Sequence, residues 1–271
     1  MTMGNDPITI PSEWDVPEFR TEFWRGKTKS HCVIIPVINE GERIRLFVER
    51  MQQSGISQVA DIIIVDGGSK DGSLEHNSLI QAGIQGLLTK LGAGKLSAQL
   101  RVGYAFALAQ DYEGIITIDG NNKDDPSAIP SFISAIENGY DFVQASRFIQ
   151  GGQHENTPPS RYLAIRYLHA PLLAVSSGFP WTDTTQGFRA YSSRALLDGR
   201  VNIFRNVFST YELLAYLSYR LPKLGYRCIE LPAKRDYPLG EVPTKISAVR
   251  GNLSLVKILV KACLGRYDPP A

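Results

Sequence analysis

IIIVDGGSKDG, residues 62–72, is an apolar strand that ends abruptly in an acidic, glycine-rich turn. The same design recurs in GIITIDGNNKDDP, residues 114–126. Continuous apolar strands bounded by turn residues are typical of a parallel sheet covered on both faces. In open α/β sheets, ligands bind outside the carboxyl ends of the strands. Two strands that carry carboxylates to that edge, at Asp66 and Asp119, predict a site for a polar ligand such as a metal-bound phosphate.

Strands and helices alternate along the first half of the chain, which predicts an α/β fold with a mostly parallel central sheet, flanked by helices and joined by right-handed crossovers. The second half is less regular. Residues 1–30 are expected to form an irregular N-terminal arm, and residues 31–271 a single domain with a C-terminal amphipathic helix. The expected strands are 31–38, 62–66, 84–88, 114–119, 141–145, 184–191 and 226–231; helices are expected near 73–82, up to 109, from 126, over 160–177, over 209–220 and over 244–263.

Composition narrows the class of protein. A formal charge of +2 over 271 residues is too balanced for wholesale nucleic-acid binding, so no nucleic-acid partner is expected. The three cysteines show neither metal-ligand spacing nor a disulfide framework, which favours a reducing cytoplasm. The polar N-terminus does not resemble a signal peptide, and no segment reaches the ~20 apolar residues of a membrane-spanning helix. We expect a cytoplasmic protein, for which peripheral contact with the inner face of a membrane stays open.

Two nucleotide-binding motifs are excluded. Gly92-Ala-Gly94-Lys95 lacks the flanking residues of a P-loop, since Thr89 and Leu96 occupy its first and last positions. The first strand ends without the glycine triplet of a dinucleotide-binding fold. The simplest interpretation of the loop is a glycine turn before a helix, although Lys95 and Arg101 could approach a diphosphate.

Asp119, Asn121 and Asp124 could ligate Mg²⁺ or Mn²⁺, which favour carboxylate, amide and phosphate oxygens. The alternative is a solvated turn in which Asp125 caps the next helix. Arg147 and Arg161 lie next to a predicted strand end and helix start, where arginine can bind phosphate with both arms of its guanidinium group. Their alternative role is solubility alone.

Six motifs occur in an order that resembles family 2 glycosyltransferases, and the closest likeness is to the polyprenyl (dolichol) phosphate mannosyl- and glucosyltransferase branch. The resemblance spans roughly residues 31–235. It implies a GT-A fold and an inverting transfer from a nucleotide-activated sugar. The motifs are Pro36-Val-Ile-Asn39-Glu40, Ile64-Val-Asp66-Gly-Gly-Ser69-Lys-Asp71-Gly72, Ile118-Asp119-Gly-Asn121, Ser146-Arg147, Gly151-Gly152 and Asp183-Thr-Thr-Gln186-Gly187-Phe188-Arg189.

The resemblance also implies roles for individual residues. Pro36, Asn39 and Glu40 would line the nucleoside pocket, and Asp66 would bind the base, either uracil or guanine. Asp119 and Asn121 occupy the metal-binding Asp-X-Asp positions. Gln186 and Arg189 would close the donor and acceptor pocket, and Arg147 and Arg161 would hold the acceptor phosphate.

Two departures from the family pattern matter. Asn121 replaces the second aspartate and removes one negative charge from the metal site, for which Asp124 or Asp125 could compensate. The C-terminal segment with Leu253, Val256, Leu259 and Val260 could lie on a membrane surface, or it could pack on the core.

The leading hypothesis is therefore a metal-dependent transfer from a GDP- or UDP-sugar to a polyprenyl phosphate. If the acceptor were instead a saccharide hydroxyl, in polysaccharide or glycolipid synthesis, a general base would be needed, and Asp183 is the candidate. Asn121 motivates a rival from another class, a non-catalytic nucleotide-sugar-binding or scaffold protein. A nucleotidyltransferase ranks third.

Overall fold

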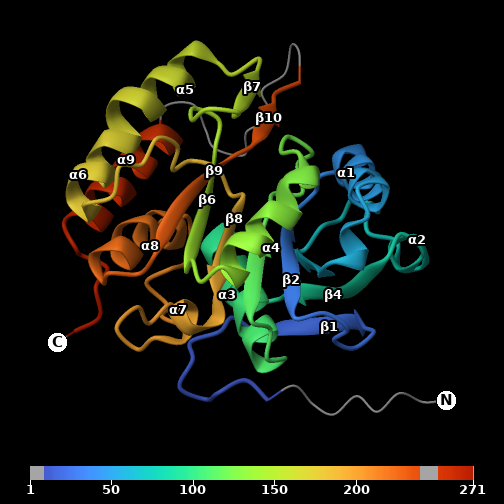
Figure 1. The fold of residues 1–271 in the computed structure, drawn as a ribbon. Coiled ribbons are helices and arrows are strands. Elements are labelled where there is room, and N and C mark those ends of the chain that lie inside the picture. Colours follow the sequence, from blue (N-terminus) through green and yellow to red (C-terminus); the bar gives the residue numbers. More distant parts are fainter. Residues whose placement is uncertain (1–8, 239–249, 271) are drawn as a thin grey trace.

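The computed structural model describes residues 9–238 and 250–270. Its centre is a sheet with the strand order β1-β4-β3-β2-β5-β8-β6-β9 (Figure 1). These strands are β1 (Phe19–Trp24), β2 (His31–Val37), β3 (Asp61–Asp66), β4 (Ile84–Lys90), β5 (Gly114–Thr117), β6 (Phe142–Ser146), β8 (Arg189–Ser192) and β9 (Cys228–Pro232). The neighbours β4, β3, β2 and β5 are parallel, as are β6 and β9. Every residue of β2 and β3 is buried, which confirms strands covered on both faces.

Helices cover both faces of this sheet (Figure 1). Buried apolar residues divide into two clusters, one on each side. On one side lie α1 (Glu42–Gln53), α2 (His76–Gln81) and α4 (Ile129–Glu137); on the other lie α3 (Leu96–Ala109), α6 (Ala170–Ser177), α8 (Glu212–Lys223) and α9 (Arg250–Cys263). Helix α1 buries Ile44, Phe47, Val48 and Met51, the spacing of a one-sided helix. Short connecting elements are η1 (Ile56–Gln58), η2 (Pro126–Ala128) and α7 (Ser193–Leu197).

The N-terminal arm is more ordered than predicted. Residues 19–24 form β1, which pairs antiparallel with β4, and Trp14 stacks on Phe204 with ring centroids 4.0 Å apart. Strand β4 would otherwise leave an edge of unpaired backbone groups, and β1 satisfies them. The irregular-arm prediction is therefore wrong for this segment.

The strand predicted over 184–191 is shorter and runs in the opposite direction to its neighbours. Only Arg189–Ser192 forms β8, antiparallel to both β5 and β6. The residues before it are held outside the sheet: the Glu230 carboxylate binds the backbone N–H groups of Thr182 and Asp183 at 2.9–3.0 Å, and the Arg189 guanidinium binds the carbonyls of Thr184 and Gln186. These contacts fix the loop that precedes β8 at the carboxyl edge of the sheet.

The helix predicted over 160–177 is present but interrupted. It consists of α5 (Pro159–Ala164), a π-turn η3 (Ile165–His169) and α6. Pro171 has no N–H group to donate to the carbonyl of Tyr167, so the regular helical ladder cannot pass this point unchanged. A π-turn inserts one extra residue into a helix and is frequent at functional sites.

Helix α9 confirms the predicted C-terminal helix over residues 250–263; the part predicted over 244–249 falls outside the described residues. It packs against α6 and α8 through Ile258, Leu259 and Ala262. Packing on the core, the alternative considered for this segment, is therefore correct for one side of the helix. Among the described residues, no helix is both long and apolar enough to cross a bilayer.

A small two-stranded sheet completes the fold. Strand β7 (Gln153–Glu155) pairs in parallel with β10 (Lys234–Asp236). An isolated bridge joins Asp124 to Arg235 of β10. This pairing brings a segment from late in the chain beside the loop that follows β5.

Candidate active site

A cavity of about 1,080 Å³ opens at the carboxyl ends of β2 and β5. Polar residues from the loops after these strands, from the start of α3 and from β10 line one end. Apolar residues of α5, η3, α8 and α9 line the other end, among them Ile165, Leu168, Leu214 and Val256. The cavity therefore offers a charged end and an apolar end to a bound ligand.

The residues predicted to hold a nucleoside are distributed over two adjoining hollows. Pro36 and Glu40 line the main cavity, and Glu40 forms an ion pair with Arg43 at 2.8 Å. Asn39 instead joins two loops, because its side chain accepts from the backbone N–H of Lys70 at 2.8 Å. Its left-handed backbone, with φ of 46°, is a conformation that asparagine tolerates.

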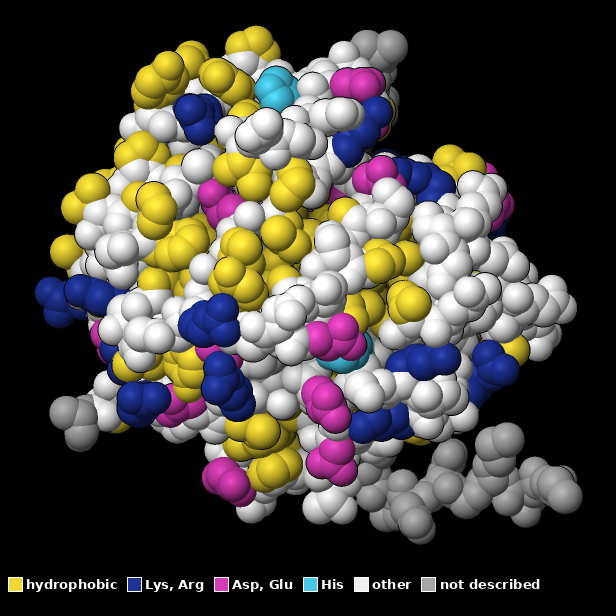
Figure 2. Space-filling view, viewed as in Figure 1, with side chains coloured by type: hydrophobic (Ala, Val, Ile, Leu, Met, Phe, Trp, Pro, Cys, Tyr) yellow, Lys and Arg dark blue, Asp and Glu magenta, His cyan; other side chains and the backbone are white. Residues whose placement is uncertain are grey.

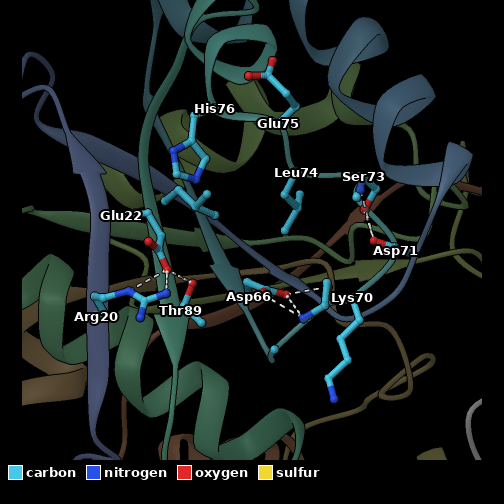
Figure 3. A pocket seen from close by; sticks show the side chains of 14 residues that line it. Arg20, Glu22, Asp66, Lys70, Asp71, Ser73, Leu74, Glu75, His76 and Thr89 are labelled. Atoms are coloured by element: carbon cyan, nitrogen blue, oxygen red, sulfur yellow. Dashed lines mark hydrogen bonds and ion pairs between the residues drawn. The ribbon is translucent and has the colours of Figure 1, made fainter.

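Asp66 borders a separate hollow of about 580 Å³ between the β3 turn and the β1–β4 edge (Figure 3). Its carboxylate accepts hydrogen bonds from the backbone N–H of Ser69 at 2.9 Å and from the Ser69 hydroxyl at 2.6 Å. Gly67, the next residue, lines the main cavity. Asp66 thus shapes the turn between the two hollows.

Of the two cations predicted near a diphosphate, only Lys95 is in place. Lys95 is exposed and lines the cavity at the start of α3. Arg101 is buried, and its guanidinium donates to the Asp15 carbonyl and, at 3.1 Å, to Asn206. The assignment of Arg101 to ligand binding is wrong, because Arg101, six residues after Lys95, contacts Asp15 and Asn206 instead of lining the cavity.

The acidic tip after β5 is divided between the cavity and the interior. Asp119 and Asn121 line the cavity, and the Asn121 amide donates to Asp119 at 3.4 Å. Asp124 is fully buried and paired with Arg235, whose other nitrogen lies 3.5 Å from Asp119. Asp124 is therefore not available as a metal ligand, since its charge is already compensated inside the protein.

Asp119 and Asn121 could hold a divalent cation only together with oxygen atoms of a bound substrate. Within the described residues, no group of three His, Cys, Asp or Glu side chains could hold a metal ion by itself. Mg²⁺-type sites, however, often take one or two protein oxygens plus substrate phosphates. Asp119 and Asn121 supply two such oxygens.

Gly187 explains the close packing around Asp119. A side chain at position 187 would collide with Oδ1 of Asp119. The glycine lets the loop before β8 lie directly against this carboxylate, which joins the last of the six sequence motifs to the metal-binding motif.

Arg147 and Asp183 form a buried pair instead of facing the cavity. Their side chains are 1% and 0% exposed, and the guanidinium binds the carboxylate through Nε at 2.7 Å and Nη2 at 3.1 Å. Gln186, also fully buried, donates to the same carboxylate at 2.9 Å. Two predictions are therefore wrong: Arg147 does not contact an acceptor directly, and Asp183 is not exposed as a general base. The two side chains bind each other, away from the cavity.

Arg189 lines the cavity, and its guanidinium already binds several groups of the protein. It donates to the carbonyls of Gln186, Thr184 and Leu214 at 2.8–2.9 Å. These bonds hold the loop before β8 to α8. Arg189 therefore forms part of the cavity wall, and the buried Gln186 accepts a hydrogen bond from it through its backbone carbonyl.

Arg161 lines the cavity, as predicted, and it lies beside Tyr237, which the sequence did not single out. Its Nη1 donates to the hydroxyl of Tyr237 at 3.2 Å. Arg147 donates to the same hydroxyl at 3.4 Å, and Lys123 lies 5.1 Å from the centre of the ring. Arg235 is 5.7 Å from it. Four cations thus surround one tyrosine at the charged end of the cavity.

This arrangement perturbs the acidity of Tyr237. Burial by itself raises the pKa of the phenol, but Arg235, Arg147 and Arg161 outweigh burial and lower the pKa to about 8. An anion that enters here meets the same positive field.

Ultraviolet titration of the folded protein is expected to show one phenol ionising near pH 8, and Tyr237→Phe should remove that step. Because this pKa lies below the ordinary value of 10.0, ionisation stabilises the fold as the pH rises from about 8 to 10, and that contribution is lost as the pH falls through 8. Tyr226→Phe is the control, since the pKa of Tyr226 is raised to about 12. A step near pH 8 that survives in Tyr237→Phe would contradict the assignment.

His169, at the end of the π-turn, also lines the cavity. Its Nδ1 lies 2.8 Å from the Thr184 hydroxyl. Burial and then Arg189 lower its pKa to about 4, so the ring is neutral at physiological pH. The sequence does not mark this histidine as a site residue, because nothing along the chain shows that η3 turns it toward the loop before β8.

Comparison with known proteins identifies the family to which the chain belongs. The model of the family described as "Glycosyl transferase family 2" matches residues 32–199. Polyprenol monophosphomannose synthase of Mycolicibacterium smegmatis is 25% identical over 269 residues, 98% of this chain and 93% of that protein. Dolichyl-phosphate hexose transferase of Haloferax volcanii is 30% identical over 210 residues, 76% of this chain and 82% of that protein.

Among solved structures, glucosyl-3-phosphoglycerate synthase from Mycobacterium tuberculosis, in complex with Mn²⁺, UDP and glucosyl-3-phosphoglycerate, matches with a TM-score of 0.56. The two sequences are 17% identical, and the match covers 89% of this chain and 81% of that one. This likeness bears on the fold, which is the GT-A fold expected from the sequence. The family model covers more than half of the chain, and the chain belongs to glycosyl transferase family 2.

Proposed function

We propose that this glycosyltransferase moves a sugar from a nucleotide-diphosphate donor to a polyprenyl phosphate. The observation that carries the proposal is the two-ended cavity, in which Asp119, Lys123, Arg161 and Arg235 lie at one end and Ile165, Leu168 and Val256 at the other. A lipid phosphate needs both kinds of surface, cations for its head and apolar side chains for the start of its chain. The names of the two curated relatives support the same acceptor class.

We place the donor diphosphate between Lys95 and the Asp119–Asn121 pair. The start of α3 offers little backbone to it, because the N–H groups of Lys95 and Ser97 already bind the carbonyls of Ser209 and Thr210 at 2.7–2.8 Å. Side chains must therefore hold the phosphates. Asp119 and Asn121 would hold Mg²⁺ or Mn²⁺, which when bound stabilises negative charge on the departing diphosphate.

The acceptor oxygen attacks the anomeric carbon from the face opposite the diphosphate, so the configuration inverts. The bond from that carbon to the diphosphate oxygen breaks as the new bond forms, and the nucleoside diphosphate leaves with the electron pair. Arg161 and the neighbouring Lys123 and Arg235 orient the acceptor phosphate. This orientation accelerates the reaction because it holds the attacking oxygen close to the anomeric carbon.

The titratable groups favour a phosphate over a hydroxyl as the acceptor. A hydroxyl must lose a proton to a base within hydrogen-bond reach, whereas a phosphate oxygen is already anionic. Asp183 is sealed in its pair with Arg147, and His169, with a pKa of about 4, is a weak base. Neither group suits the hydroxyl reaction.

Incubation with GDP- and UDP-sugars plus polyprenyl phosphate is expected to give a lipid-linked sugar, detected by its partition into organic solvent. Mg²⁺ or Mn²⁺ should support the transfer and a chelator should stop it. Parallel reactions would offer a saccharide hydroxyl as acceptor. Transfer to the saccharide alone would overturn the acceptor assignment, and donor binding without transfer to any acceptor would favour a non-catalytic role.

A further inference from the structure

Three long segments of the chain carry no acidic residue: 76–110, much of which is buried in β4 and α3, and two others, 156–182 and 242–267. None of the 27 Asp and Glu residues falls within 156–182 or within 242–267, where about five would fall if acids were spread evenly over the 271 positions. The latter two segments contain seven Lys and Arg residues. Since the whole chain carries only +2, the rest of it has a formal charge of −5. Positive charge is therefore concentrated in these two segments.

Exposed apolar side chains gather in the same segments. Among the described residues, the five most exposed large hydrophobic side chains are Val175 (88%), Tyr167 (75%), Leu253 (72%), Leu264 (67%) and Leu163 (54%). All five belong to α5, η3 and α6 or to α9 and the turn that follows it. Apolar side chains that cluster on a surface mark an interaction site more often than scattered ones.

The two segments are neighbours in space. Helix α6 packs against α9, and both pack against α8 (Figure 1). Figure 2 shows hydrophobic side chains gathered along the edge of the molecule where Figure 1 places α5 and α6. We name the exposed side chains of α5, η3, α6, α9 and the turn that follows α9 the basic apolar face. It reaches the mouth of the cavity, since Leu168 is 40% exposed and also lines the cavity wall.

The cations of this face are available to a partner. Arg166, Lys257, Lys261 and Arg266 are exposed. Within residues 9–238 and 250–270, none of them forms an ion pair with the protein. Tyr167 adds an aromatic ring with a polar tip, a side chain suited to the boundary between water and hydrocarbon.

We propose that the basic apolar face binds an anionic lipid bilayer, with Tyr167 and Val175 at the acyl boundary and the cations against the headgroups. The proposal rests on the proposed function, because the chain of a polyprenyl acceptor lies in a bilayer and must enter the cavity from it. Charge decides between a bilayer and a second copy of the protein: two such faces would bring like charges together, whereas anionic headgroups complement them. The cavity mouth then faces the membrane.

Vesicle sedimentation tests the surface without any assay of transfer. The full chain is expected to bind phosphatidylglycerol-containing vesicles at least tenfold more tightly than phosphatidylcholine vesicles, and salt should weaken the binding. Tyr167→Glu combined with Val175→Glu should reduce binding to the anionic vesicles at least tenfold. The matched control is Leu46→Glu with Val59→Glu, two side chains each 42% exposed, outside this face, and it should bind like the unaltered protein.

Circular dichroism melting would confirm that both double variants fold. Equal binding of the unaltered protein to neutral and anionic vesicles, or equal loss in both variants, would overturn the proposal. So would a dimer in solution that only Tyr167→Glu with Val175→Glu converts to a monomer, because the face would then be a self-interface.

Two acceptors separate this proposal from the proposed function. With a water-soluble, short-chain prenyl phosphate, the Tyr167→Glu/Val175→Glu protein should keep its turnover, whereas transfer to long-chain acceptor in vesicles should fall at least tenfold. Equal rates for variant and control on the vesicle acceptor would overturn the docking surface. Failure of the unaltered protein on both acceptors would overturn the proposed function, while vesicle sedimentation would still decide the surface.

Discussion

Asp119→Ala is expected to lower kcat/KM for sugar transfer by at least about 100-fold, because charge on the departing diphosphate would lose its main stabilising contact. The fold should be almost unaffected. Within the described residues, the hydrogen-bond and ion-pair contacts of the Asp119 carboxylate are long, at 3.4 Å to Asn121 and 3.5 Å to Arg235, and Arg235 keeps its buried partner Asp124. Initial rates and urea unfolding would be measured on the same preparations.

Asp125→Ala is the matched control for this prediction. Asp125 lies in the same loop but does not line the cavity; its carboxylate caps η2 through the N–H of Ser127 at 3.1 Å. Its removal should cost about 1 kcal/mol of stability and little activity. A near-normal rate in Asp119→Ala would show that neither a metal nor the diphosphate depends on this carboxylate.

Arg147→Met should destabilise the protein by about 3–5 kcal/mol, because it strands the Asp183 carboxylate in the interior. Direct contact with the acceptor phosphate, as the family resemblance implies, would instead give a selective loss of acceptor use, but Arg147 does not line the cavity. The effect should therefore appear in the free energy of unfolding, measured with urea. Arg147→Met with Asp183→Asn should recover part of the loss, since the double variant removes the unpaired charge.

Arg161→Ala provides the contrast. Arg161 lines the cavity and its contact with Tyr237 is only partly buried, so its loss should raise the KM for the acceptor phosphate with little change in stability. If Arg147→Met instead unfolded like the unaltered protein and had a raised KM for the acceptor, the result would support direct contact between Arg147 and the acceptor.

The parallel half of the sheet could be predicted because its signals are local. Each strand of that half is a short apolar run that ends at a turn, and strands with this pattern place their carboxyl ends at one edge. Asp119 and Asn121 therefore reach the cavity as expected. The edge strand β1 also had a local signal, the alternation of Phe19, Thr21 and Phe23, which the nearby prolines obscured.

The rest of the site depends on contacts between distant segments. Arg235 reaches Asp124 and Asp119 only because β10 pairs with β7, and Tyr237 follows from the same pairing. Nothing in Lys234-Arg235-Asp236-Tyr237 distinguishes these residues from an ordinary charged strand. Arg147 and Asp183 were recognised as functional candidates, yet their mutual distance, which decides their role, is set by β8 running against its neighbours.

The π-turn η3 lets one helical segment contribute both to the cavity and to the exposed surface. Successive residues of an α-helix are rotated by about 100°, so the extra residue in η3 turns everything after it by that angle relative to a continuous helix. Arg161 before the turn and His169 at its end thereby both reach the cavity, while Tyr167 and Val175 remain outside. In a regular helix, Arg161 and His169 would be separated by about 80° around the axis; the inserted residue reduces this separation to about 20°, so that one helix presents both side chains to the cavity.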